Sequence, residues 1–164
     1  MYKHKKKSTP CENATLLSAL TAFFVICCFF LLVWVLTTQI KDHYSQYEPK
    51  LLELSTKLKK LFPDLCNSVS FHIGDSSYTI NKSKIYLALC DKNGDYYSDN
   101  TLMHVLLHEL AHVKSHDIGH TPLFHENFQK ILEIAEKHGL YDPSIPVPDD
   151  YATNASGVCS PKKK

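Results

Sequence analysis

The stretch that decides the fold is His108-Glu109-Leu110-Ala111-His112. It lies in an apolar run that contains neither Gly nor Pro, and such a run predicts a buried helix. Ser98-Asp99-Asn100 stands just before the run and offers N-cap residues for that helix. The apolar residues of the run are Leu102, Met103, Val105, Leu106, Leu107, Leu110, Ala111 and Val113.

The spacing of the two histidines predicts a metal site. Residues i and i+4 share one face of a helix, so His108 and His112 should point the same way, with Glu109 nearby. Two such imidazoles can hold one Zn²⁺, and the adjacent carboxylate can take a proton from water at the metal. A structural histidine pair is the alternative. It is disfavoured because polar groups in an apolar helix are costly unless they are paired or bound to metal.

The residues that follow predict a turn and a second helix. Gly119 can turn the chain after the first helix. Thr121-Pro122 has the form of an N-cap followed by the first helical residue. The second helix should continue to about His138 and stop at Gly139, where a glycine can end it.

Several residues compete to be the third metal ligand. His120 is the leading candidate, because it sits on a short connection that can fold back over the first helix. His116 lies about one turn beyond the H-E-x-x-H motif, and His125 lies on the second helix beside Glu126. His116, His125 and a Glu ligand such as Glu126 remain alternatives to His120.

These residues resemble the WLM and SprT-like zincin metallopeptidases, in which H-E-x-x-H precedes a short loop, a third His and an amphipathic helix. Gly119-His120, then Phe124 and Phe128, continue that pattern here. The closer similarity is to small WLM-like metallopeptidases predicted in large DNA viruses and some protists. Segments 77–82, 85–87 and 139–143 also recur there, so the resemblance covers roughly Leu61 to Cys159.

The resemblance implies zinc as cofactor, hydrolysis of peptide bonds, and three zinc ligands, with Glu109 as the general base on water at the zinc. The implied ligands are His108, His112 and His120. The group that stabilises the oxyanion is open; His116, His125 and Tyr86 are candidates for that role or for supporting the ligands. Zincins bind substrate along an edge strand beside the catalytic helix, and residues 84–90 are the candidate strand.

The N-terminus predicts a membrane anchor. Four lysines among the first seven residues precede an uncharged stretch from Thr15 to Thr38. That stretch can cross a hydrocarbon core of about 30 Å as a helix. It is longer than the roughly 7–15-residue core of a signal peptide and lacks an A-x-A cleavage pattern. The positive-inside rule then places the N-terminus in the cytoplasm and the rest in a lumenal or external space, on a viral or host-cell membrane.

Together these patterns predict an α+β protein with four regions. They are a basic tail (1–14), a transmembrane anchor (15–40), a small zincin-like domain (41–160) and a second basic tail (161–164). The domain should pack helices, including one at 48–62, on a short, mostly antiparallel sheet with strands at 69–73, 78–80 and 84–89.

Charge and composition point to a protein or peptide as the partner. From Lys41 onward the chain has 14 Lys and 16 acidic residues, and it has no Arg at all. A surface that binds nucleic acid usually carries a basic stripe with Arg, so nucleic acid is disfavoured as a partner.

The cysteines leave the disulfide open. Cys66, Cys90 and Cys159 are the three that follow the apolar stretch. An odd number allows one bond, Cys66–Cys159 or Cys66–Cys90, in an oxidising compartment. Asn81-Lys82-Ser83 and Asn154-Ala155-Ser156 are glycosylation sequons that matter only in a lumenal domain.

The sequence therefore predicts a membrane-anchored zinc metallopeptidase. One alternative is a non-catalytic, zinc-stabilised membrane protein that acts in assembly or partner binding. Another is a chance motif in a membrane-tethered interaction domain. The intact Glu109 favours hydrolysis, because a purely structural metal site has no use for a general base.

Overall fold

The computed structural model describes residues 10–45, 48–149, 151, 155–156 and 159. The chain divides into two compact units, Met1–Lys41 and Asp42–Lys164. The expected basic tail at 161–164 and the first nine residues of the expected tail at 1–14 lie outside the described residues.

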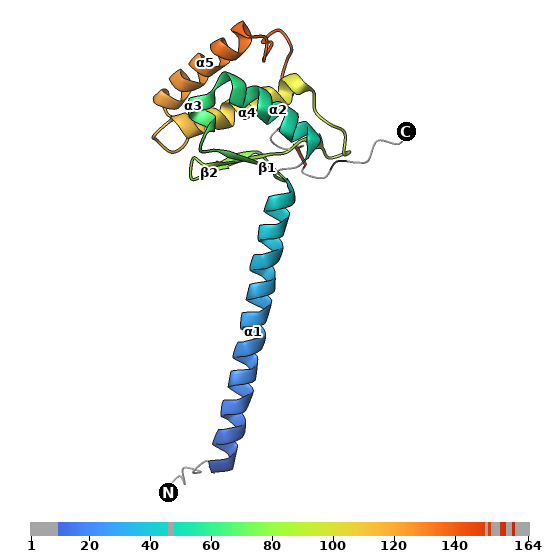
Figure 1. Ribbon diagram of the computed structural model, residues 1–164, viewed down its shortest axis with the longest axis vertical. Coiled ribbons are helices and arrows are strands. Elements are labelled where there is room, and N and C mark those ends of the chain that lie inside the picture. Colours follow the sequence, from blue (N-terminus) through green and yellow to red (C-terminus); the bar gives the residue numbers. More distant parts are fainter. Residues whose placement is uncertain (1–9, 46–47, 150, 152–154, 157–158, 160–164) are drawn as a thin grey trace, which may run out of the picture. The chain divides into compact units, whose positions relative to one another are not determined.

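Helix α1 (Pro10–Ser45) carries the long apolar stretch (Figure 1). Its segment Leu17–Ile40 is long and apolar enough to cross a membrane, a test that an N-terminal signal sequence also passes. Large apolar side chains such as Phe23, Phe29 and Trp34 are exposed on it. A contiguous exposed apolar surface of this kind marks contact with a membrane or another protein.

A three-stranded sheet with the order β1-β3-β2 lies in the second unit. β1 (Ser70–Ile73) runs parallel to β3 (Lys84–Leu87), and β2 (Tyr78–Ile80) runs antiparallel to it. The sheet is therefore mixed, which corrects the mostly antiparallel sheet expected from the sequence. β3 is buried at three of its four positions, and this apolar strand takes the central place between the other two.

Four helices accompany this sheet: α2 (Pro49–Leu61), α3 (Pro63–Cys66), α4 (Asp99–Lys114) and α5 (Pro122–Lys137). α2 packs against β1, α4 packs against β2 and β3, and α5 packs against α4 (Figure 1). The second unit is thus α+β, as predicted. Its fully buried side chains include Leu51, Leu54, Leu58, Ile85, Leu87, Leu102, Leu106, Leu110 and Phe124.

Side-chain caps fix where the two long helices begin. The Ser98 hydroxyl accepts the Thr101 N–H at 3.1 Å, and the Thr121 hydroxyl accepts the Phe124 N–H at 3.3 Å. Such caps satisfy backbone donors that have no partner within the helix. Both caps lie where the sequence predicts helix starts.

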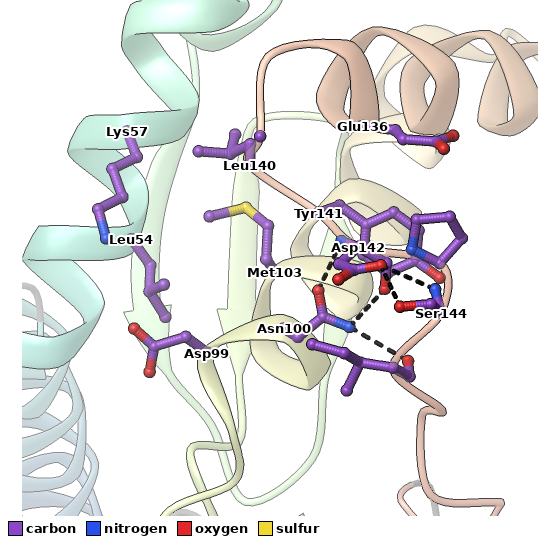
Figure 2. A pocket seen from close by; sticks show the side chains of 13 residues that line it. Leu54, Lys57, Asp99, Asn100, Met103, Glu136, Leu140, Tyr141, Asp142 and Ser144 are labelled. Atoms are coloured by element: carbon purple, nitrogen blue, oxygen red, sulfur yellow. Dashed lines mark hydrogen bonds between the residues drawn. The ribbon is translucent and has the colours of Figure 1, made fainter.

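After α5 comes the C-terminal strap, which is described at residues 142–149, 151, 155–156 and 159. Its start is held by the Asn100 amide, which donates to the carbonyls of Asp142 (3.0 Å) and Ile145 (3.2 Å) (Figure 2). Farther along, the Tyr151 hydroxyl donates to the Ala88 carbonyl at 2.8 Å. At the end of the strap, β5 (Ala155–Ser156) pairs antiparallel with β4 (Cys90–Asp91).

A disulfide joins Cys90 to Cys159. Both pairings expected from the sequence used Cys66, and both are wrong. Cys66 is free and buried in the core, with 2 % of its surface exposed. The pairing of β5 with β4 instead brings Cys159 back beside Cys90, with 5.5 Å between their Cα atoms, a usual separation for a disulfide.

Candidate metal centre

His108, His112 and His120 form a cluster in which one ring nitrogen from each lies within 4.8 Å of the others. The Nε2 atoms of His108 and His120 are 3.0 Å apart. Zn–N bonds of about 2.0–2.1 Å in a tetrahedral site put ligand nitrogens roughly 3.3 Å apart. Small ring rotations would therefore bring all three nitrogens to one ion, so the donor set fits Zn²⁺.

The Phe124 ring supports the cluster from within the core. It is 1 % exposed, and its centroid lies 5.0, 4.4 and 4.7 Å from those of His108, His112 and His120. An apolar ring in contact with three imidazoles limits their rotation and keeps water from that side. The second helix thus positions the ligands through packing.

The loop that carries His120 is fixed at its start and turned at Gly119. The Ser115 carbonyl accepts a hydrogen bond from Lys82 Nζ, and the Ser115 hydroxyl accepts one from the Asn127 amide at 3.1 Å. Gly119 has φ +82°, a left-handed conformation that glycine adopts without steric cost. The following residue, His120, therefore reaches the helix that carries the other two histidines.

The environment holds the two helical histidines neutral. Burial, together with the neighbouring His112 and His120, lowers the pKa of His108 to about 4. Burial, followed by His120 and Lys82, lowers the pKa of His112 as well. Neutral imidazole is the form that binds a metal ion.

Glu109 is buried beside the cluster, with 5 % of its surface exposed. The Thr79 hydroxyl lies 2.8 Å from Glu109 Oε2 and 3.1 Å from the Glu109 carbonyl oxygen. Burial raises the pKa of Glu109 to about 7, and the hydrogen bond from Thr79 opposes that rise. Thr79 was missed by the sequence reasoning, because a threonine in a strand carries no signal of such a contact.

Two other candidate histidines and Glu126 lie apart from the cluster. His116 follows the end of α4 and is exposed. His125 lies in the first turn of α5, with its ring centroid 6.2 Å from that of His120. Glu126 is exposed and pairs with Lys130 at 2.5 Å. The structure thus brings His120, rather than these alternatives, to the H-E-x-x-H histidines.

Tyr86 and Lys82 have places that the sequence reasoning did not foresee. Tyr86 stacks between His72 and Tyr78, with ring centroids 5.0 and 4.8 Å apart. Lys82 lies in the β2–β3 turn and lines a cavity together with His112. It brings a positive charge to the site, a role that its place in the Asn81-Lys82-Ser83 sequon does not indicate.

Two cavities flank the cluster and share His108 and Glu109. The loop pocket, about 560 Å³, is bounded by β2, the β2–β3 turn, α4 and residues 117–120. The strap pocket, about 320 Å³, lies between α4, Ser76-Ser77 and the C-terminal strap. A larger hollow of about 950 Å³, shown in Figure 2, contains none of the cluster residues, and Asn100 bonds with the strap there.

The strand beside the site is β2. Tyr78 and Thr79 of this strand line the loop pocket, and β2 lies at an edge of the sheet. The prediction that residues 84–90 form the edge strand for substrate is wrong. Its β3 portion is the central strand, paired on both sides by β1 and β2.

The fold and the site define an α+β protein with one N-terminal apolar helix and a three-histidine cluster. The chain belongs to the same family as "Uncharacterized protein 042R" of Invertebrate iridescent virus 3, to which it is 38% identical over 124 residues. That match covers 74% of this chain and 77% of the relative.

Two further viral proteins are similar over shorter lengths. "Uncharacterized protein 136R" of Invertebrate iridescent virus 6 is 44% identical over 81 residues, 48% of this chain and 46% of the relative. "Uncharacterized protein R325" of Acanthamoeba polyphaga mimivirus is 31% identical over 106 residues, 61% of this chain and 50% of the relative. The chain thus spans about half the length of these two. No protein-family model and no solved structure matches the chain.

Proposed function

We propose that the chain is a membrane-anchored, zinc-dependent peptidase of the H-E-x-x-H zincin type, similar to the WLM and SprT-like enzymes. The observation that carries the proposal is the meeting of three imidazoles with a buried carboxyl group between two open cavities. A structural zinc site closes four positions with protein ligands, whereas three ligands leave a position for chemistry.

His108, His112 and His120 would hold the metal. When bound, zinc would supply a Lewis acid that polarises a carbonyl group and makes water acidic near neutral pH. Glu109 takes the proton from the attacking water and passes it to the leaving amine. Thr79 orients the Glu109 carboxyl group through the hydrogen bond to Oε2.

A peptide substrate fits beside β2 in extended form. Backbone pairing along an edge strand gives affinity, and pockets for alternate side chains give specificity. β2 borders the loop pocket, and the turn before it borders the strap pocket, so a peptide following this strand passes the cluster.

We further propose that Leu17–Ile40 of α1 is an uncleaved membrane anchor. The four lysines before it favour a cytoplasmic N-terminus, which puts the second unit in the lumenal or external space. The Cys90–Cys159 disulfide supports the same orientation, because disulfides persist in oxidising compartments.

The test uses the full chain purified in detergent micelles. Metal analysis should find about one Zn²⁺ per chain, and His108→Ala or His112→Ala should abolish it. Glu109→Gln should keep the metal and lose peptide hydrolysis, since it deletes the base and keeps the shape. His138→Ala, an exposed histidine at the end of α5, is the matched control and should change neither quantity.

The outcomes separate the alternatives. Wild-type protein without zinc would refute the metal centre. Zinc with no hydrolysis of any peptide would favour the non-catalytic, zinc-stabilised protein. Equal rates of hydrolysis by wild type and Glu109→Gln would show that Glu109 is not the general base.

A further inference from the structure

The strap pocket has a polar wall that is distinct from the metal cluster. It shares Ser77, His108 and Glu109 with the loop pocket, and the C-terminal strap adds Val147, Asp149 and Tyr151 to its lining. At about 320 Å³ it is of the size that a side chain of a bound peptide would fill.

The hydroxyl protons of Ser77 and Tyr151 in this wall are committed to a closed set of hydrogen bonds. Tyr151 donates to the Ala88 carbonyl at 2.8 Å, and the Ala88 N–H donates to Ser77 Oγ at 3.0 Å. Ser77 Oγ and the Tyr151 hydroxyl are 2.7 Å apart. Because the Tyr151 proton is on the carbonyl, the Ser77 proton must lie on the Tyr151 oxygen. Both hydroxyl groups can therefore offer a ligand lone pairs, but neither has a proton to give.

The acidic side chains that line the pocket are Glu109 and Asp149, and a metal held by His108 would add positive charge on the side of the cluster. Asp149 lies at its exposed rim, and no lysine is among the described residues that line it. The loop pocket differs, because Lys82 and Asp117 both line it. The two ends of the site therefore present different electrostatic environments to a peptide.

We propose that the strap pocket receives one side chain of the peptide substrate and selects a cationic side chain, lysine or arginine, an inference that rests on the proposed peptidase function. An ammonium or guanidinium group brings only donors, which match the lone pairs of the wall and the Asp149 carboxylate. A glutamate side chain would meet acceptors and a like charge. A glutamine brings donors but no charge, so it should bind between the two.

The test measures peptide binding without cleavage. The full-length Glu109→Gln protein in detergent micelles is titrated into fluorescein-labelled decapeptides of Ala, Gly and Ser. These peptides carry one central Lys, Arg, Gln or Glu and are followed by fluorescence anisotropy. The Lys and Arg peptides should bind about three- to fivefold tighter than the Gln peptide, which is the gain expected from an exposed ion pair with Asp149. The Glu peptide should bind most weakly.

Substitutions at Asp149 assign the effect to this pocket. In the same background, Asp149→Asn should reduce the Lys-over-Gln preference below about twofold and leave Gln affinity unchanged, and Asp149→Lys should favour Glu. Asp117→Asn, an exposed acid of the loop pocket, is the matched control and should keep the preference.

Three results would overturn the inference: no measurable binding, a preference for Gln or Glu peptides by the parent protein, or a Lys preference that survives Asp149→Asn. Zinc content and hydrolysis are measured separately on the wild type. A protein that binds zinc and cleaves peptides without a basic preference keeps the proposed function and loses only this inference.

Discussion

At the scale of single residues, His120 depends on what surrounds it. It is exposed, unlike Glu109, and it follows a glycine in a left-handed conformation. Its contacts are with His108, His112 and Phe124, and its Nε2 lies against the Nε2 of His108. Because the side chain is exposed and contacts the cluster, its substitution should change zinc binding with little effect on the stability of the fold.

We expect His120→Ala to weaken zinc binding by at least about tenfold, a loss that even changes to groups supporting a ligand can cause. His116→Ala and His125→Ala should leave the metal bound, because neither belongs to the cluster. Competition with a chromogenic chelator measures all three affinities on the full chain. If His120→Ala binds zinc normally and His116→Ala or His125→Ala loses zinc, the third ligand is the histidine whose loss abolishes binding.

Which residues could be predicted follows from the range of the interactions. The i, i+4 pair and the N-caps Ser98 and Thr121 depend on neighbours within one turn, so the sequence contains them. The contact of Thr79 with Glu109 joins positions thirty residues apart. It exists only once β2 lies beside α4, and no local pattern encodes that.

At the scale of elements, the sheet shows the same limit. Each strand's position was close to its expected range, because alternation of apolar residues is local. The order β1-β3-β2 is not local, because it depends on which strand has the most apolar surface to bury between its neighbours. The most buried strand took the centre, which moved the edge, and with it the substrate-binding strand, to β2.

Loosening the strap should weaken substrate binding and leave zinc binding unchanged. Its disulfide spans a separation of 69 residues. Closing a loop of that length in the unfolded chain corresponds to about 4 kcal/mol in the chain-entropy model. The strap also forms one wall of the strap pocket, whereas the three ligands come from α4 and the loop before α5.

We therefore expect Cys159→Ser, or reduction by a phosphine that carries no metal-chelating thiol, to lower the free energy of unfolding by roughly 2–4 kcal/mol and to weaken peptide binding. Zinc content should not change. Denaturant titration with and without the reductant measures the first effect. Cys66→Ala is the control: it keeps the disulfide, so reductant should lower its stability as in wild type. Unchanged stability on reduction of the wild type would show that the bond contributes nothing.

At the scale of the whole molecule, the proposed orientation rests on the lysines and the disulfide, and a glycosylation sequon can report it. Lysines precede the apolar stretch, a disulfide lies in the second unit, and a glycosylation sequon begins at Asn81. Asn81 is exposed in the β2–β3 turn, with φ +49°, and it borders the loop pocket. The second sequon begins at Asn154, which lies outside the described residues.

We expect the full chain, translated with eukaryotic microsomes, to be glycosylated at Asn81. Asn81→Gln and Ser83→Ala should each remove the same glycan, because the sequon needs both residues. Replacing the four N-terminal lysines with glutamate should reduce glycosylation, since under the positive-inside rule such charges favour a cytoplasmic N-terminus. Gel mobility before and after glycosidase treatment measures each case, and protease added outside the vesicles should spare the second unit.

Two other patterns would change the assignment. An unglycosylated second unit that external protease destroys, with the lysine-rich end protected, would place the candidate site in the cytoplasm. The disulfide would then face a reducing environment, and the strap pocket would lack its covalent tie. A glycosylated product shortened by the length of α1 would instead identify the apolar stretch as a cleaved signal sequence. The second unit would still enter the oxidising compartment, and the proposed peptidase would be secreted rather than anchored.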